Sequence, residues 1–296
     1  MSSAPDSVRV HIASYNTASA TELAIRSAIR LAGRPFSLTV GDAASTDGSP
    51  EMLGALARRR LIECQMAQER VIHSEWLDRW LRDCDAEYAV FADSDVEFRR
   101  PGWLAGLVDA ARHDGADLVY AETLPGATTF IIPRSGKVVS LAPRPAPWLF
   151  LVRAARAREV GESFAEKTIP SADGALPLTY DVGGLFFRAA VAHGLSWRVM
   201  PRAYRRSYRH YGGLSWMSGA AGERKRAHDR AMIDAGLARE RALEQGDRRA
   251  ASRLAARAAW LRGSRLASES VTKARPKRVA RGIRRRVDAH ANTFRG

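Results

Sequence analysis

The sequence predicts an α/β fold in which helices flank a mostly parallel sheet, and three observations support this prediction. Short apolar runs recur along the N-terminal half, too brief and too rich in aromatic and β-branched residues for helices. Segments in which apolar residues follow helical spacing separate these runs, which implies right-handed crossovers between parallel strands. Polar residues follow the ends of the strands, at the edge where α/β sheets bind ligands. The chain of 296 residues is long enough to bury a full core.

Strands and helices are expected to alternate from the N-terminus. The apolar runs predict strands at residues 8–13, 36–40, 61–64, 88–92 and 118–121. The first helix is expected at residues 21–31, with Thr21 as its N-cap, and the second at residues 50–59, with Pro50 in its first turn. A third helix, ending near Cys84, is indicated by an apolar stripe of Trp76, Leu77, Trp80 and Leu81. We expect the next helix to begin near residues 101–103.

The net charge of +15 is concentrated near the C-terminus. Residues 251–296 hold 13 Lys and Arg against two acidic residues, so +11 of the +15 lies there. This distribution argues against a nucleic-acid footprint over the whole surface. The chain has no apolar run of the roughly 20 residues that span a bilayer, and residues 1–7 lack the apolar core of a signal peptide. Two cysteines, Cys64 and Cys84, are too few for a disulfide framework, so we expect a cytoplasmic protein.

Two carboxylates leave the predicted strand at residues 88–92 together. Asp93 and Asp95 are two residues apart, so in extended backbone they point to the same face while Ser94 points away. Like charges on one face repel unless a cation lies between them, and Mg²⁺ or Mn²⁺ prefers oxygen ligands. The alternative is that Asp93 opens a turn and Asp95 caps the following helix.

Other polar residues follow the first two predicted strands. Ser14, Tyr15 and Asn16 come after the first strand, and Asp42 comes after the second. The carboxyl ends of parallel strands meet at one edge of a sheet, so we expect these residues to lie near Asp93 and Asp95. Residues 45–49 have turn composition, with Asp47 as a turn or cap residue.

The order and spacing of these motifs resemble the family 2 glycosyltransferases of GT-A fold. The motifs are Ser14-Tyr15-Asn16, then Asp42 followed by Ser45-Thr46-Asp47-Gly48-Ser49, and then Asp93-Ser94-Asp95. The resemblance covers roughly residues 8–103, and residues 210–213 more loosely. It implies an inverting, metal-dependent enzyme that moves a sugar from a nucleotide diphosphate-sugar, with UDP or dTDP favoured, to a hydroxyl acceptor.

The resemblance also implies roles for individual residues. Ser14, Tyr15, Asn16, Asp42 and Asp93 would contact the donor nucleotide. Tyr15 could stack on a pyrimidine, and Asp42 could accept the N3–H that uracil and thymine offer. The alternatives are a loop aromatic that packs on the sheet for Tyr15 and a turn-forming residue for Asp42. Asp93-Ser94-Asp95 resembles the DxD motif, in which Mg²⁺ or Mn²⁺ bridges the donor diphosphate.

Two further candidates come from the second half of the chain. His210 would be an additional metal ligand, as in several relatives; a packed or surface histidine is the alternative. Asp181 is the candidate general base that takes the proton of the acceptor hydroxyl, and the glycines that follow it permit close approach of substrate. An ordinary turn would have the same residues. His11 is expected in the core or on the sheet surface, and His73 in a capping or packing role.

The resemblance suggests a domain of residues 1–222, with a nucleotide-binding half at 1–124 and an acceptor half at 125–222. Residues 223–296 would form a basic, helix-prone extension. That extension is either solvated or in contact with an anionic membrane surface, and nucleic acid is not expected because no aromatic residues are interleaved with its charges. A membrane contact would suit a lipid-linked acceptor; a polysaccharide is the other candidate.

Two rival functions remain at this stage. A sugar-phosphate nucleotidyltransferase would carry a Gly-rich loop with a basic residue after the first strand, where this chain has Ser14-Tyr15-Asn16. A non-catalytic nucleotide-sugar-binding protein could dock on membrane or nucleic acid through the basic tail.

Overall fold

The computed structural model describes residues 7–123, 128–131, 138–142, 144–170, 176–201, 204, 206–212, 214 and 219–273. The chain divides into two units, Met1–Arg226 and Ala227–Gly296. The boundary predicted between residues 222 and 223 falls inside the helix α7 (Gly219–Glu244) and stays a prediction.

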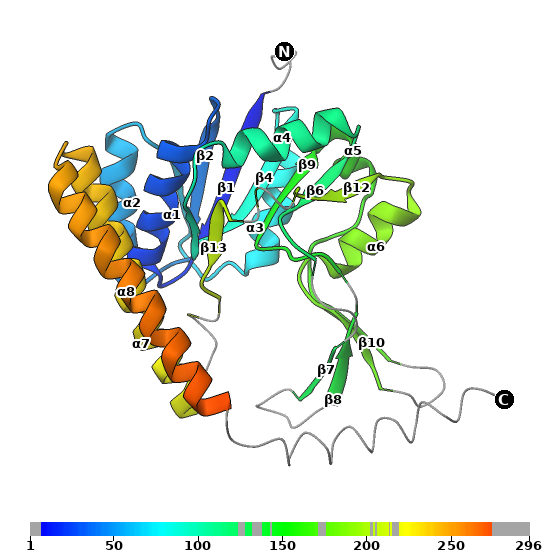
Figure 1. The fold of residues 1–296 in the computed structure, drawn as a ribbon. Helices are drawn as coiled ribbons and strands as arrows, with labels where there is room; N and C mark the ends of the chain where they lie inside the picture. Colours follow the sequence, from blue (N-terminus) through cyan, green and yellow to red (C-terminus); the bar gives the residue numbers. More distant parts are fainter. Residues whose placement is uncertain are drawn as a thin grey trace. The chain divides into compact units, whose positions relative to one another are not determined.

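A seven-stranded sheet forms the centre of the first unit (Figure 1). Its strands, in spatial order, are β12 (Trp197–Val199), β6 (Leu118–Tyr120), β9 (Leu149–Arg153), β4 (Tyr88–Asp93), β1 (Val8–Ser14), β2 (Ser37–Asp42) and β3 (Glu63–Met66). Every neighbouring pair is parallel except the two that include β9, which runs antiparallel to both β4 and β6. The mostly parallel sheet predicted from the sequence is confirmed.

Strands β1 and β2 run further than their apolar residues indicated. Ser14 pairs with Asp42 and Ala13 with Asp93 at the ends of the parallel ladders. Backbone hydrogen bonding therefore continues into the polar residues and carries them to one edge of the sheet. Strand β3 starts later than expected because Leu61 still donates its N–H to Leu56 at the end of the preceding helix.

The predicted helices are present, but the N-cap residue predicted for the first one is wrong. They are α1 (Ala18–Leu31), α2 (Ser49–Arg58), α3 (His73–Asp83) and α4 (Trp103–His113). Thr21 does not cap α1: it lies inside the first turn, where its hydroxyl donates to the carbonyl of Thr17. The helix starts early because Asn16, with φ of 53°, turns the chain directly into it, and the carboxylate of Asp47 accepts the N–H of Ala18.

Two apolar layers cover the two faces of the central sheet. Consecutive strand residues point to opposite faces, so Val90 packs with the layer that includes Trp103, while Phe91 packs with the layer that includes Trp80. His11 lies in the second layer, stacked against Trp80 and Phe91, with 2% of its surface exposed. Its predicted place in the core is confirmed.

Two smaller sheets complete the first unit. A four-stranded sheet, in the order β10 (Lys167–Ile169), β11 (Leu178–Tyr180), β8 (Val138–Leu141) and β7 (Thr128–Ile131), lies towards the end of the central sheet at which β1 terminates (Figure 1). A two-stranded sheet pairs β5 (Val96–Phe98) with β13 (Tyr208–His210). Because β5 follows Asp95 directly, the alternative that Asp95 caps a helix is wrong. Helices α5 (Ala154–Glu159) and α6 (Gly184–Ala192) follow β9 and β11.

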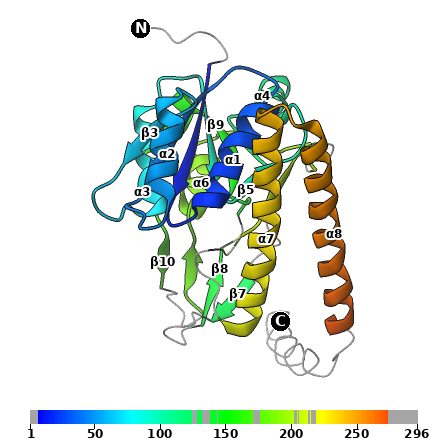
Figure 2. The same cartoon turned by 90° about the vertical axis from the view of Figure 1, so that its left-hand side faces the viewer.

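Two long helices follow the sheets, α7 and α8 (Arg248–Lys273), as the helix-prone composition predicted. They run side by side in opposite directions (Figure 2), and Gly246 adopts a φ of 78° in the turn between them. None of the helices in the described part of the chain is long and apolar enough to cross a membrane. The part of the predicted basic extension beyond position 273 lies outside the described residues.

Candidate functional site

A cleft of about 460 Å³ opens at the carboxyl edge of the central sheet. Among the side chains lining it are Tyr15, His73, Asp93, Asp95, Asp181 and His210. Residues from the ends of β1 and β4 thus meet there, as the parallel order of these strands predicted, together with residues from the second half of the chain.

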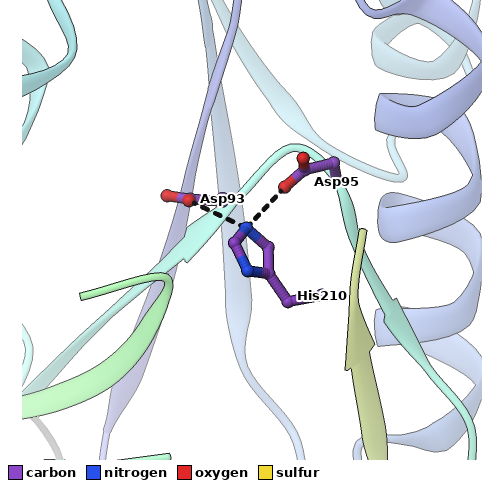
Figure 3. Close-up of side chains that lie close together, drawn as sticks. All are labelled: Asp93, Asp95 and His210. Carbon is purple, nitrogen blue, oxygen red and sulfur yellow. Dashed lines mark ion pairs between the residues drawn. The ribbon is translucent and has the colours of Figure 1, made fainter. Parts of the chain in front are cut away.

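Three of these side chains form a compact cluster (Figure 3). His210 directs Nε2 at both carboxylates, 3.5 Å from Oδ2 of Asp93 and 3.1 Å from Oδ1 of Asp95. One ligand atom from each residue lies within 4.8 Å of the other two. The two carboxylates lie together as expected, although a turn at residues 94–95 and not extended backbone brings them there, and this set of two oxygens and one nitrogen could hold a divalent cation.

The pairing of β5 with β13 brings His210 to the acidic pair. Val96 and His210 are register partners, and the N–H of Tyr211 donates to the carbonyl of Asp95 at 3.1 Å. The hydroxyl of Tyr211 donates to the buried carboxylate of Glu97 at 2.9 Å, and Lys225 donates to the carbonyls of residues 211 and 212. Burial and the charge of Glu97 raise the pKa of Tyr211, so its hydroxyl keeps its proton.

Each charge in the cluster favours the ionised form of its neighbour. Burial lowers the pKa of His210, but hydrogen bonds to Asp93 and Asp95 and their negative charges outweigh burial and raise it to about 9. Burial also opposes ionisation of Asp93, yet the hydrogen bond from His210 and the charges of His73, His210 and Arg144 hold its pKa below the ordinary value. The arrangement therefore favours a positive charge between two carboxylates.

Two aromatic neighbours of the cluster were not predicted as such: Trp148 was not singled out from the sequence, and His73 was expected only in a capping or packing role. Trp148 stacks on His210, with ring centroids 4.7 Å apart and planes at 16°. His73, the first residue of α3, places Nε2 3.6 Å from Oδ1 of Asp93. Trp148 immediately precedes β9, and no local pattern shows that β9 inserts beside β4; for His73, its position at a helix start near the ligand edge was the available signal.

The residues at the end of β1 and directly after it differ in where they lie. Ser14 is buried and lines the cleft, where its hydroxyl lies 2.9 Å from that of Thr21. Tyr15 lines the cleft, and the guanidinium of Arg70 lies 4.7 Å from its ring centroid. Asn16 is exposed and outside the described cleft lining; its Oδ1 accepts the N–H of Thr46, joining the loops after β1 and β2.

Asp42 is buried and is not among the residues that line the cleft. Its Oδ2 accepts the N–H of Ser45 at 2.9 Å, as in the turn that this loop predicted. Its Oδ1 is buried and, among the described residues, lacks a hydrogen-bond partner. Asp47 accepts the N–H groups of Ala18 and Ser49, so its predicted turn and cap role is confirmed.

Asp181 lies in the cleft as part of an ion pair. It follows β11, its side chain is 35% exposed, and its Oδ2 accepts a hydrogen bond from the nearly buried guanidinium of Arg144. Its Oδ1 accepts the N–H of Val182 at 2.7 Å. Gly183, with φ of 74°, makes the turn into α6 that holds this loop at the cleft.

Part of the chain matches a known family. Residues 9–128, less than half of the 296, match the model of glycosyl transferase family 2. This segment contains every predicted site residue that follows β1, β2 and β4. No curated protein matches the chain.

Solved structures share its fold at low identity. TarS 1–349 from S. aureus is 14% identical, has a TM-score of 0.50, and the match covers 80% of this chain and 72% of that one. The mannosyltransferase PcManGT from Pyrobaculum calidifontis, in complex with GDP-Man and Mn²⁺, is 16% identical with a TM-score of 0.49, covering 98% and 83%. The predicted GT-A fold is confirmed, and residues 9–128 are similar to the glycosyl transferase family 2 model.

Proposed function

We propose that the chain moves a sugar from a nucleoside diphosphate-sugar, with UDP or dTDP favoured, to a hydroxyl acceptor. One observation carries this proposal: Asp93, Asp95 and His210 converge in the cleft that also contains Tyr15 and Asp181. In this proposal the residues of the cleft supply what such a transfer needs, namely ligands for a cation, a surface for a nucleobase and a carboxylate that can take a proton.

The cation in this proposal is Mg²⁺ or Mn²⁺, held by Asp93, Asp95 and His210. Its chemistry is to neutralise the negative charge that develops on the leaving diphosphate as the sugar–phosphate bond breaks. Trp148, stacked on the imidazole, fixes the ring plane so that Nε2 stays aimed at both carboxylates. Such outer contacts commonly orient histidine ligands.

The donor nucleotide is proposed to bind at the exits of β1 and β2. Tyr15 offers a face for the base, and Ser14 and Asn16 shape the loop beside it. Asp42 does not line the cleft, so it would have to turn Oδ1, which is buried and unpartnered in the described structure, towards the cleft to accept an imide N–H. A buried carboxylate oxygen without a donor is costly, so an N–H from the base would remove that cost. Ala43, the next residue, lines the cleft.

Asp181 is the proposed general base. In an inverting transfer the acceptor oxygen attacks the anomeric carbon as its proton passes to the carboxylate. Both oxygens of Asp181 accept one hydrogen bond, from Arg144 and from Val182, and each keeps a second lone pair for the acceptor hydroxyl. In this proposal, Arg144 is a positioning residue that fixes the orientation of the carboxylate.

The acceptor is proposed only by class, as a hydroxyl of a lipid-linked sugar or a polysaccharide. We also propose that the reaction takes place in the cytoplasm, as the cysteine usage predicts. Both cysteines are free thiols in the structure.

Release of nucleoside diphosphate tests catalysis. A panel of nucleotide sugars is incubated with the full chain, with Mn²⁺ or with a chelator. Asp95→Ala is expected to reduce release by at least a hundredfold, since transition-state charge is then left without its cation. Asp109→Ala, which removes an exposed carboxylate on α4, is the matched control and should leave release unchanged.

A second experiment separates turnover of the donor from binding of the nucleotide. A thermal-shift screen of UDP, dTDP, GDP and CDP identifies the base, because a ligand that binds the native state raises the melting temperature by mass action. Tight nucleotide binding without diphosphate release from any donor would favour the non-catalytic binding protein instead.

A further inference from the structure

One face of α8 combines arginines with an exposed tryptophan. We name Arg249, Arg253, Arg257 and Trp260 the arginine–tryptophan face. All four side chains are exposed, and Trp260, at 70%, is the most exposed large apolar side chain in the described part of the chain. Removing an indole from water is favourable, so one left this open marks a contact surface.

The geometry of the helix makes this face flat and accessible. At about 100° per residue, these four positions fall within an arc of about 80° along three turns of helix. A planar surface can therefore touch all four side chains at once. The opposite side of α8 carries different residues: Ala251 and Ala258 are buried, and Leu254 is half-buried.

The charges on this face are of one sign. The sequence has no Asp or Glu from residue 248 to residue 268, so no arginine of the face has an acidic neighbour three or four positions away on its own helix. Arginines four residues apart repel one another and weaken an isolated helix. An extended anionic surface would attract each of these arginines and so offset the repulsion between them.

We propose that the arginine–tryptophan face binds the surface of an anionic lipid membrane. The guanidinium groups would lie against headgroup phosphates, which they can bind in a bidentate manner. Trp260 would enter the headgroup layer, where an amphipathic indole is favoured. Each basic residue at such a surface strengthens binding by roughly fivefold, so the three arginines together contribute on the order of a hundredfold.

Lipid is favoured over nucleic acid by the arrangement of the face. Single-stranded nucleic acid is usually held by several aromatic side chains interleaved with charge, and the arginine–tryptophan face has a single aromatic residue, Trp260. A row of charges confined to one narrow arc fits a plane better than a groove. This binding does not depend on the proposed transferase reaction, although it would hold the enzyme where a lipid-linked acceptor lies.

Vesicle sedimentation of the full chain tests the proposal. The probes are phosphatidylcholine vesicles with and without phosphatidylglycerol. The triple variant Arg249→Gln, Arg253→Gln, Arg257→Gln should bind the anionic vesicles about a hundredfold more weakly, and Trp260→Ala should bind them several-fold more weakly. Glutamine is a good helix former, so circular dichroism should show unchanged helix content.

The matched control removes the same charge elsewhere. Arg58→Gln, Arg60→Gln, Arg82→Gln changes three exposed arginines of the first unit and should bind vesicles within twofold of the wild type. Equal vesicle binding by the triple variant and the wild type would overturn the proposal. Failure of the wild-type protein to bind anionic vesicles would also overturn it. Binding to single-stranded RNA that needs the face, without vesicle binding, would assign it to nucleic acid. Donor turnover without acceptor should be unchanged in these variants, so failure of either proposal is distinguishable.

Discussion

His210 is the residue on which the proposed cation site depends most directly, because among the described residues it is the one that contacts both Asp93 and Asp95. His210→Ala removes one of three ligands and is expected to weaken Mn²⁺ binding by at least tenfold, measured by calorimetry on the full chain with UDP present. His113→Ala is the control, since that imidazole is exposed on α4. Equal Mn²⁺ affinity in wild type and His210→Ala would show that the histidine is not a ligand.

His11 makes stability depend on pH in a specific window. Burial, aided by the charge of Arg9, lowers its pKa from 6.5 to about 3, and both ring nitrogens are buried without partners in the described structure. The unfolded chain therefore binds this proton more tightly. The stability that His11 contributes is present above pH 6.5 and is lost as the pH falls towards 3.

The expected loss is about 1.4 kcal/mol per pH unit within that window. Between pH 7 and pH 5 the unfolding free energy of the wild type, from urea titration, should fall by roughly 2 kcal/mol more than that of His11→Phe. Phenylalanine keeps the stack between Trp80 and Phe91 but cannot bind a proton. Parallel pH profiles for the two proteins would refute this assignment.

At the scale of elements, Gly41 fixes how closely α3 approaches β2. A Cβ at this position would lie 2.7 Å from the ring of Trp80 and 2.9 Å from that of Trp76, which also lines the cleft. Gly41→Ala is therefore expected to destabilise the chain by about 1–3 kcal/mol through overpacking.

Gly54→Ala is the matched control for this packing. Gly54 lies in α2, where its nearest neighbour would be the flexible end of Arg58 at 3.5 Å. Alanine there should stabilise the chain by about 0.5–1 kcal/mol, because it favours helix. Denaturant midpoints that move in the same direction for both variants would contradict the packing argument.

At the scale of the whole molecule, the cation is expected to stabilise the native state. If Mn²⁺ binds only that state, a concentration of about 100 times the dissociation constant adds about 2.7 kcal/mol, which raises the melting temperature by several degrees. A chelator should reverse the rise, and Asp95→Ala should show neither change. Calorimetric melting of the full chain with UDP checks this, and a chelator-sensitive rise in Asp95→Ala would place the cation elsewhere.

The sequence predicts the parts of the molecule that depend on local pattern. Parallel strands in alternation with helices have a restricted topology, so Tyr15, Asp93 and Asp95 could be assigned to one edge before the structure was known. Thr21 shows the limit of such reasoning: the helix began earlier because Asp47, from another loop, accepts the N–H of Ala18.

Contacts between distant segments were beyond sequence analysis. The strands β5 and β13 are three residues each, too short for a periodic signal, and their pairing joins residues more than 100 positions apart. The insertion of β9 beside β4, which places Trp148 on His210, is equally non-local. The Arg144–Asp181 pair also follows from the tertiary fold, since no spacing rule links two such residues.

The β5–β13 pairing has a consequence for the order in which the enzyme matures. During synthesis Asp93 and Asp95 leave the ribosome long before His210, so a nascent chain that ends before β13 has an acidic pair without its third partner. The proposed ligand set is complete only after β13 has returned to the sheet and docked against β5. If these residues bind the cation as proposed, high-affinity metal uptake would signal that the first unit has finished folding.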